Sequence, residues 1–241
     1  MKKLINWTNI RLLLIVGILF SLFSFTSNRN KSRKLKKSVV VFVGDNPLFL
    51  KRETVNKLLI ENNRNASSIE KDKLDLNKLE NALDSNEMIE KSDVFVSVDG
   101  ILKAVVKQKT PIARVFDGDS SFYIGYEGSK MPLSDNFTAR VPLVSGRINE
   151  KNREKIADLL RIIYDDDFLK KNIISIEIMP NGSLKMLNRD FNYQINFGSV
   201  INVEGKFKNY KAFFQKAILD SSLYNYKKID LRFTQQVVCT K

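Results

Sequence analysis

The hydrophobic pattern of the sequence begins with an apolar run, LLLIVGILFSLFSF at residues 12–25, that contains no charged side chain. Together with Ile10 and a snorkelling Arg11 it extends over about 16 residues, slightly fewer than the ~20 that usually cross a bilayer. We therefore predict a single N-terminal transmembrane helix. The predicted segments are a short tail at 1–9, the anchor at 10–26 and a basic linker at 27–37.

A cleaved signal peptide is the main alternative for this run, because the apolar region of a signal peptide is similarly short. The sequence that follows, TSNRNKSRK at 26–34, lacks a small-x-small cleavage site and becomes basic at once. This favours an uncleaved anchor. A buried helix of a soluble protein is the least favoured of the three interpretations.

Residues 38–110 have the pattern of a small domain with two helices and three strands. The β-branched run VVVFV at 39–43 indicates a strand, and Gly44, Asp45 and Pro47 stop it. Two later stretches place apolar residues three and four positions apart, which is the spacing of a helix face. They are Val55, Leu58 and Leu59, and then Leu76, Leu79 and Leu83, which follow Asp75, a predicted helix cap.

A β-hairpin is predicted at the end of this domain. Alternating valines at 94–98 lead to the tight-turn residues Asp99 and Gly100, and a second apolar run follows. Proline has no N–H to give to a sheet, so we expect Pro111 to end the second strand or to lie on an edge. Strand-like sequence resumes at Ile112, which suggests that Pro111 separates two domains. The predicted domains are 38–110 and 111–241.

Residues 111–241 mix strand and helix signals in a way that is typical of an α+β layer. Alternation at 122–126 and 174–178 and a short run at 140–146 predict strands, and Asn181-Gly182 predicts a hairpin turn before a further strand at 193–197. Two stretches have helical spacing: Ile156, Leu159, Leu160 and Ile163, and then Phe207, Tyr210, Phe214, Ala217 and Ile218. We expect a mostly antiparallel sheet with two helices.

Net charge changes this picture only at the N-terminal end. The formal charge is +13, which invites a nucleic-acid interpretation. Residues 1–37, however, contain nine Lys or Arg and no acid, and the rest has 31 basic against 27 acidic residues. We therefore expect no nucleic-acid partner, and we expect the basic linker to contact anionic lipid headgroups.

The residue types needed for common catalytic sites are scarce. There is no histidine, and Cys239 is the single cysteine. Imidazole metal sites, Ser-His-Asp triads and Cys-His dyads are therefore excluded. The acidic run YDDDF at 164–168 is interpreted as a solvated helix end, because consecutive residues point in different directions. We expect no enzymatic activity, no metal and no cofactor.

The chain resembles the FtsQ/DivIB family of bitopic bacterial cell-division proteins, in its flavobacterial form. The resemblance rests on several stretches: LDLNKLENALDSNEMIEKSDVFVSVDG at 74–100, KQKTPIARV at 107–115, SFYIGYEGSKMPLS at 121–134, ARVPLVSG at 139–146 and YKKIDLRFTQQVVCTK at 226–241. It implies a POTRA domain of strand-helix-helix-strand-strand order at 38–110, followed by an FtsQ-type β domain. It also implies an inner-membrane protein with its tail in the cytoplasm and its body in the periplasm.

The charges around the anchor argue against that orientation. Three Lys or Arg precede or begin the span and six follow it closely. The positive-inside rule alone would therefore place the body in the cytoplasm. The periplasmic orientation is an implication of the resemblance.

The resemblance further implies that the C-terminal region binds FtsB- and FtsL-like division partners, with other divisome components contacting the POTRA domain. The segment KIDLRFTQQVVC at 228–239 is predicted to be the last strand, with Ile229, Leu231 and Phe233 facing the core. A terminal strand offers an edge to which an extended peptide can add. The predicted partner-binding residues are Phe233, Gln235, Gln236, Val237 and Val238. The strand at 39–43 is a second candidate edge.

Two other functions remain open from the sequence. One is a POTRA-bearing factor for polypeptide transport or outer-membrane assembly, although 111–241 lacks the run of ~10-residue strands that a membrane barrel needs. The other is a membrane-anchored enzyme acting on the cell wall, which the absence of histidine makes the weaker idea.

Overall fold

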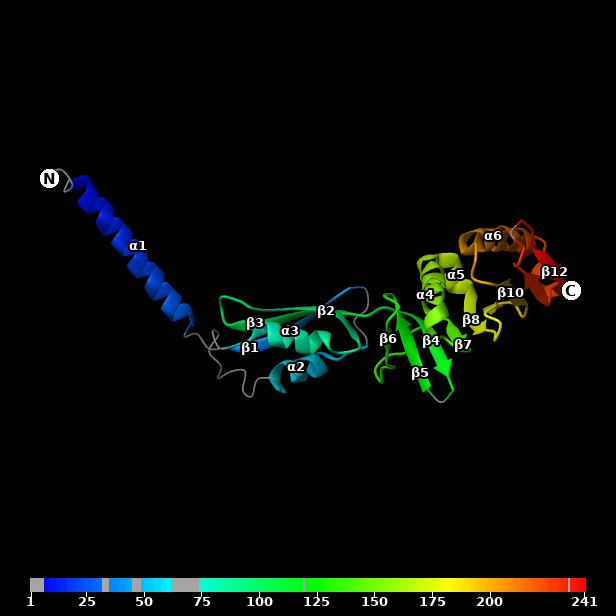
Figure 1. Ribbon diagram of the computed structural model, residues 1–241, viewed down its shortest axis with the longest axis horizontal. Helices are drawn as coiled ribbons and strands as arrows, with labels where there is room; N and C mark the ends of the chain where they lie inside the picture. The colour runs from blue at the N-terminus through cyan, green and yellow to red at the C-terminus, as the bar shows by residue number, and fades with distance from the viewer. Residues whose placement is uncertain (1–6, 32–34, 45–48, 62–73, 119, 234) are drawn as a thin grey trace. The chain divides into compact units, whose positions relative to one another are not determined.

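The computed structural model describes the chain apart from residues 1–6, 32–34, 45–48, 62–73, 119 and 234. The chain divides into two compact units, Met1–Gln108 and Lys109–Lys241. Figure 1 labels the elements along the chain. Each unit is described by itself.

The first element is helix α1, Trp7–Lys31, whose side chains are almost all exposed where they are described. Its segment Asn9–Arg29 has a mean hydropathy of 2.1, and none of it is buried against the rest of the protein. The helix is thus long and apolar enough to cross a membrane, and it extends beyond the predicted 10–26 at both ends. An apolar helix without protein cover is the arrangement expected of an anchor in lipid.

The rest of the first unit has the predicted order of strand, helix, helix, strand and strand. The elements are β1 (Lys37–Val43), α2 (Arg52–Glu61), α3 (Leu76–Asp84), β2 (Ile89–Val96) and β3 (Ile101–Gln108). The sheet order is β1-β3-β2, with β1 parallel and β2 antiparallel to the central strand β3. The two helices contribute Val55, Leu59, Leu79 and Leu83 to a core that also contains Val40 and Val106 from the sheet.

Local signals correctly located the start of α3 and the turn between β2 and β3. The Asp75 carboxylate accepts a hydrogen bond from the Lys78 N–H and so caps α3, as its position before the helix predicts. Gly100 has φ +80° in the β2–β3 turn, where glycine avoids the strain of a side chain. The predicted hairpin is confirmed.

Pro111 is the first residue of a strand rather than the last. Strand β3 ends at Gln108, and β4 runs from Pro111 to Asp117. The proline can begin an internal strand because the first residue of a strand need not donate an N–H to the ladder. The strand-like sequence after the proline belongs to this new strand, β4, and not to a continuation of β3.

The second unit contains a mixed sheet of nine strands. Its elements are β4 (Pro111–Asp117), β5 (Ser120–Gly125), β6 (Lys130–Met131), β7 (Leu143–Ser145), α4 (Glu150–Asp165), α5 (Asp167–Asn172), β8 (Ile173–Ile178), β9 (Leu184–Asn188), β10 (Gln194–Gly198), α6 (Val203–Leu219), a 3-10 turn η3 (Ser222–Asn225), β11 (Lys228–Asp230) and β12 (Val238–Thr240). The strand order is β12-β11-β10-β9-β8-β7-β4-β5-β6. Five neighbouring pairs are antiparallel, and β4–β7, β7–β8 and β10–β11 are parallel. The predicted α+β class and mostly antiparallel sheet are confirmed, but the described part of this unit has three α-helices and not the predicted two, because the short helix α5 has too few residues to show a helical spacing.

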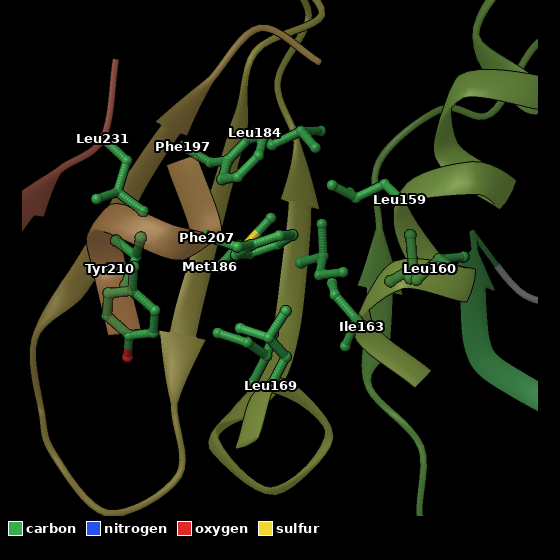
Figure 2. Packing of buried hydrophobic residues seen from close by; sticks show 14 of the residues in the cluster. Leu159, Leu160, Ile163, Leu169, Leu184, Met186, Phe197, Phe207, Tyr210 and Leu231 are labelled. Carbon is green, nitrogen blue, oxygen red and sulfur yellow. The ribbon is translucent and has the colours of Figure 1, made fainter. Parts of the chain in front are cut away.

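The helices of this unit pack on the sheet through one continuous apolar core. Figure 2 shows Leu159, Leu160 and Ile163 of α4 facing the strands together with Leu169 of α5. Phe207 and Tyr210 of α6 pack over β9 and β10 in the same cluster. The helical spacing that predicted α4 and α6 therefore marks the faces that the sheet covers, except that Ile218, predicted on the α6 face, is 48% exposed.

The acidic run at 164–168 is more than a solvated helix end. Helix α4 stops at Asp165, and Asp166 caps α5 by accepting a hydrogen bond from the Leu169 N–H at 3.0 Å. Asp166 also forms an ion pair with Lys211 of α6. Burial alone would raise the pKa of Asp166, but hydrogen bonds from Lys211 and Leu169 outweigh it and hold that pKa below its usual value.

Candidate partner-binding edge

The predicted last strand is a hairpin of two short strands. Strand β11 ends at Asp230, β12 begins at Val238, and the two run antiparallel with Ile229 opposite Cys239. The prediction of one strand over 228–239 is therefore wrong. Its alternating pattern holds only at Ile229 and Leu231, which are buried, whereas Phe233 is 46% exposed and does not face the core.

The side chain of Asp230 explains why the strand ends there. Its carboxylate accepts hydrogen bonds from the Arg232 main-chain N–H at 3.0 Å and from Nε of the same residue at 2.9 Å. An aspartate that bonds the N–H two residues later forms a turn and diverts the chain from the sheet. Burial acts to raise the pKa of Asp230, but the bonds from Arg232 outweigh it, so that pKa lies below its usual value.

Strand β12 is one edge of the nine-stranded sheet, and its ladder partner is β11. Its residues alternate in exposure. Cys239 is half-buried and packs on the core together with Val237, whereas Val238 is 40% exposed. An edge strand with an accessible side chain can accept another strand through its main chain.

The five predicted partner-binding residues lie along this hairpin. Phe233, Gln235 and Gln236 are exposed in the connection between the two strands. Val238 is exposed on β12 itself, and Val237, just before it, is half-buried against the core. The structure thus brings four accessible positions together at one end of the edge and turns Val237 inward.

An exposed aromatic residue that the sequence interpretation missed lies in the 3-10 turn that precedes β11. Tyr224 of η3 is 78% exposed, and its ring lies 5.1 Å from that of Phe191. The turn η3 shortly precedes Lys228, the β11 residue that pairs with Thr240, whereas Phe233 follows the other end of β11. The sequence feature that could have identified Tyr224 as exposed is its position in the short, mostly polar connection SSLYNYKK at 221–228.

The single cysteine has no features of a nucleophile. Cys239 is half-buried, and burial raises the pKa of its thiol above the usual value. Among the residues that the structure describes, no group of three or more Cys, Asp or Glu is arranged to hold a metal ion. The chemistry that this region offers is main-chain hydrogen bonding and apolar contact.

The second candidate edge is strand β1 in the first unit. It pairs with β3 on one side and lies at the end of the strand order. Val41 and Val43 are 41% and 43% exposed, whereas Val40 of the same strand is buried. The predicted strand is therefore half-buried, and its outward valines lie on the face of the sheet opposite the buried core.

Three comparisons with known proteins bear on this chain. A family model described as "FtsQ/DivIB, C-terminal related" matches residues 110–240. The curated Cell division protein FtsQ of Salinibacter ruber (strain DSM 13855 / M31) is 26% identical over 155 residues, which cover 58% of this chain and 60% of that protein. The match thus spans somewhat less than two thirds of the relative's length. A solved structure of the major extracytoplasmic domain of the trans isomer of the cell division protein DivIB from Geobacillus stearothermophilus is 14% identical, with a TM-score of 0.25, and covers 32% of this chain and 69% of that one.

Proposed function

Because the chain belongs to the FtsQ/DivIB C-terminal related family, we propose that it is a non-enzymatic scaffold of the bacterial cell-division machinery, anchored in the inner membrane by α1. Its body lies in the periplasm and recruits FtsB- and FtsL-like bitopic proteins in support of septal wall synthesis. Other division proteins contact the POTRA domain, for which β1 is the candidate edge.

The observation that carries the proposal is the edge position of β12. A partner segment that adds to this strand gains affinity from main-chain hydrogen bonds, whatever its sequence. Specificity then comes from side chains beside the edge. Phe233 and Gln235 supply contacts at the start of β12, and the exposed Tyr224, in the turn before β11, is a further aromatic residue that the partner can contact.

A proline substitution on the edge tests the strand-addition step. Val238→Pro removes a main-chain N–H from β12 and disfavours the extended ladder. Binding of the purified periplasmic segment of the FtsB-like protein from the same organism should fall at least tenfold for the full-length chain in detergent. Val238→Thr is the matched control, because it keeps both the N–H and the β-branched shape, and it should bind like the unaltered chain.

Photo-crosslinking in cells tests the same edge without disturbing the fold. A photoreactive residue is placed in turn at Phe233, Gln235 and Val238, and at Val41 of β1 for comparison. We expect the FtsB-like protein to be captured from the first three positions. Capture only from Val41 would move the binding site to the POTRA domain, and capture of cytoplasmic proteins alone would contradict the periplasmic orientation.

A further inference from the structure

The second unit contains a large groove away from the β12 strand. It has a volume of about 860 Å³, within the ~300–1,000 Å³ of typical ligand-binding clefts. Three segments form it: the connection from β7 into the first turns of α4, the turn between β8 and β9, and the residues that follow β10. These segments are far apart in the sequence, and the sheet brings their ends together.

Each wall of the groove is held by a specific contact. Asn149 and Asn152 form a reciprocal capping box at the start of α4. Gly146, at φ +93°, lies so close to the carbonyl of Ile178 that a β-carbon would collide with it. The buried Lys206 donates hydrogen bonds to the carbonyl oxygens of Phe197 and Ser199, which fixes the third wall. The groove is therefore formed before any ligand binds.

Five apolar side chains line the groove, and we refer to them as its floor because four of them are buried or half-buried. Ile156 and Ile178 lie buried beneath it, and Met179 and Val200 are half-buried. Ile201 also lines the groove, and its side chain is 64% exposed. Covering these side chains with an apolar group of a ligand removes apolar surface from water and so favours binding.

The rim of the groove is positively charged. Arg147, Lys151 and Lys155 line it and are exposed, and the two lysines lie one helical turn apart on α4. None of the ion pairs among the described residues involves these three cations. None of the residues that line the groove is acidic. Glu150 and Glu154, on the same helix as the two lysines, do not line it.

We infer that this groove binds an extended acidic peptide segment of a partner protein, with Asp or Glu side chains at the rim and apolar side chains on the floor. Three unpaired cations beside an apolar floor match a segment in which carboxylates and aliphatic groups alternate. A simple polyanion would satisfy the rim but leave the floor exposed. The site is separate from β12 and does not depend on strand addition there.

A binding measurement with a defined probe tests the inference. The probe is a short fluorescein-labelled peptide in which Asp or Glu alternates with Leu or Val, and its fluorescence anisotropy is followed with the full-length chain in a neutral detergent. We expect saturable binding that weakens as the salt concentration rises. A single variant that combines Arg147→Glu, Lys151→Glu and Lys155→Glu reverses all three rim charges. It should weaken peptide binding roughly tenfold or more, because three favourable charge pairs become repulsive.

Matched variants separate the groove from the overall charge. Lys171→Glu, Lys208→Glu and Lys216→Glu make the same change of net charge on exposed side chains elsewhere in the unit. Binding that this control reduces as strongly as the rim variant would overturn the inference. Ile201→Ser removes an apolar contact without a change of charge, and it should reduce affinity severalfold.

The remaining outcomes are equally decisive. A probe peptide with Asn and Gln in place of its acids should bind much more weakly than the acidic one. Failure of the acidic peptide to bind at all would overturn the inference. So would equal binding of soluble polygalacturonate that is unaffected by Ile201→Ser, because the groove would then select a polyanion instead of a peptide.

Discussion

Gly198 lies directly against the side chain of Arg232. A β-carbon at Gly198 would come within 2.6 Å of Arg232 Cγ, and the glycine also has φ +75°. Arg232 in turn holds the Asp230 carboxylate with a 2.6 Å contact from Nη2. Because Gly198 has no side chain, the Arg232 side chain can lie against the end of β10 and there form its ion pair with Asp230 in the C-terminal hairpin.

The first prediction concerns Gly198→Ala. The alanine must adopt a positive φ, at a cost of about 1 kcal/mol, and must also displace the Arg232 side chain. We expect the free energy of unfolding of the full-length chain to fall by about 2 kcal/mol in urea titrations followed by circular dichroism.

Gly182→Ala is the matched control for that substitution. Gly182 has φ +78°, but a β-carbon there meets nothing within 4 Å. The Gly182→Ala variant should therefore lose only the conformational contribution, about 1 kcal/mol of the free energy of unfolding. Equal losses in the two variants would mean that contact with Arg232 contributes nothing.

The second prediction is a pH dependence that originates at Asp230. Its pKa in the folded chain lies below the ordinary value of 3.8, so the carboxylate stabilises the fold at pH values above 3.8. This contribution is lost as the pH falls through 3.8 toward the folded-state pKa, because the unfolded chain takes up the proton first.

The variant Asp230→Asn measures this contribution. It should lower the free energy of unfolding by about 1 kcal/mol at pH 7, since Arg232 is largely exposed and solvent screens the pair. The difference from the unaltered chain should shrink steadily below pH 4. A difference that stayed constant from pH 7 to pH 3 would exclude Asp230 as the titrating group.

The third prediction concerns the buried Lys206. Burial lowers the pKa of its amino group, but Nζ donates to two carbonyl oxygens at 2.9 and 2.8 Å. Lys206→Met removes a desolvated charge but leaves those carbonyls without this donor. We expect a net loss of about 1 kcal/mol in urea unfolding.

The same variant should also weaken binding of the acidic probe peptide, because the groove wall at Ser199 loses the hydrogen bond that Lys206 donates to the Ser199 carbonyl oxygen. Lys208→Met, on the exposed side of the same helix, is the control and should change neither quantity. A peptide affinity that Lys206→Met left unchanged would show that Lys206 does not hold the groove in shape.

The fourth prediction is the orientation of the body. An alkaline phosphatase fused after Lys241 should be active in cells, because this enzyme matures only outside the cytoplasm. A β-galactosidase fusion at the same position should be inactive. The opposite pair of results would show that the six cations after the span set the orientation, as the positive-inside rule alone suggests.

Short-range patterns predicted most elements correctly. Asp75 capped the helix it precedes, and Asn181-Gly182 formed the turn between β8 and β9 with Gly182 at φ +78°. The segment after Lys228 was predicted less well, because alternation at Ile229, Leu231 and Phe233 resembles a continuous strand. A side-chain turn at Asp230 overrode that pattern, and its effect depends on hydrogen-bond geometry that periodicity does not describe.

The sequence by itself determined the apolar helix, the order of strands and helices in the first unit, the helices α4 and α6 of the second unit, and the lack of imidazole chemistry. Each of these follows from residue type and spacing within a few positions. Only the tertiary structure decided that β12 lies at the edge, that Asp166 meets Lys211, and that Arg147, Lys151 and Lys155 border one apolar groove. Those relationships join residues distant in sequence, and the packing of the sheet and helices fixes them, because burial of the whole core selects one arrangement among many with the same local patterns.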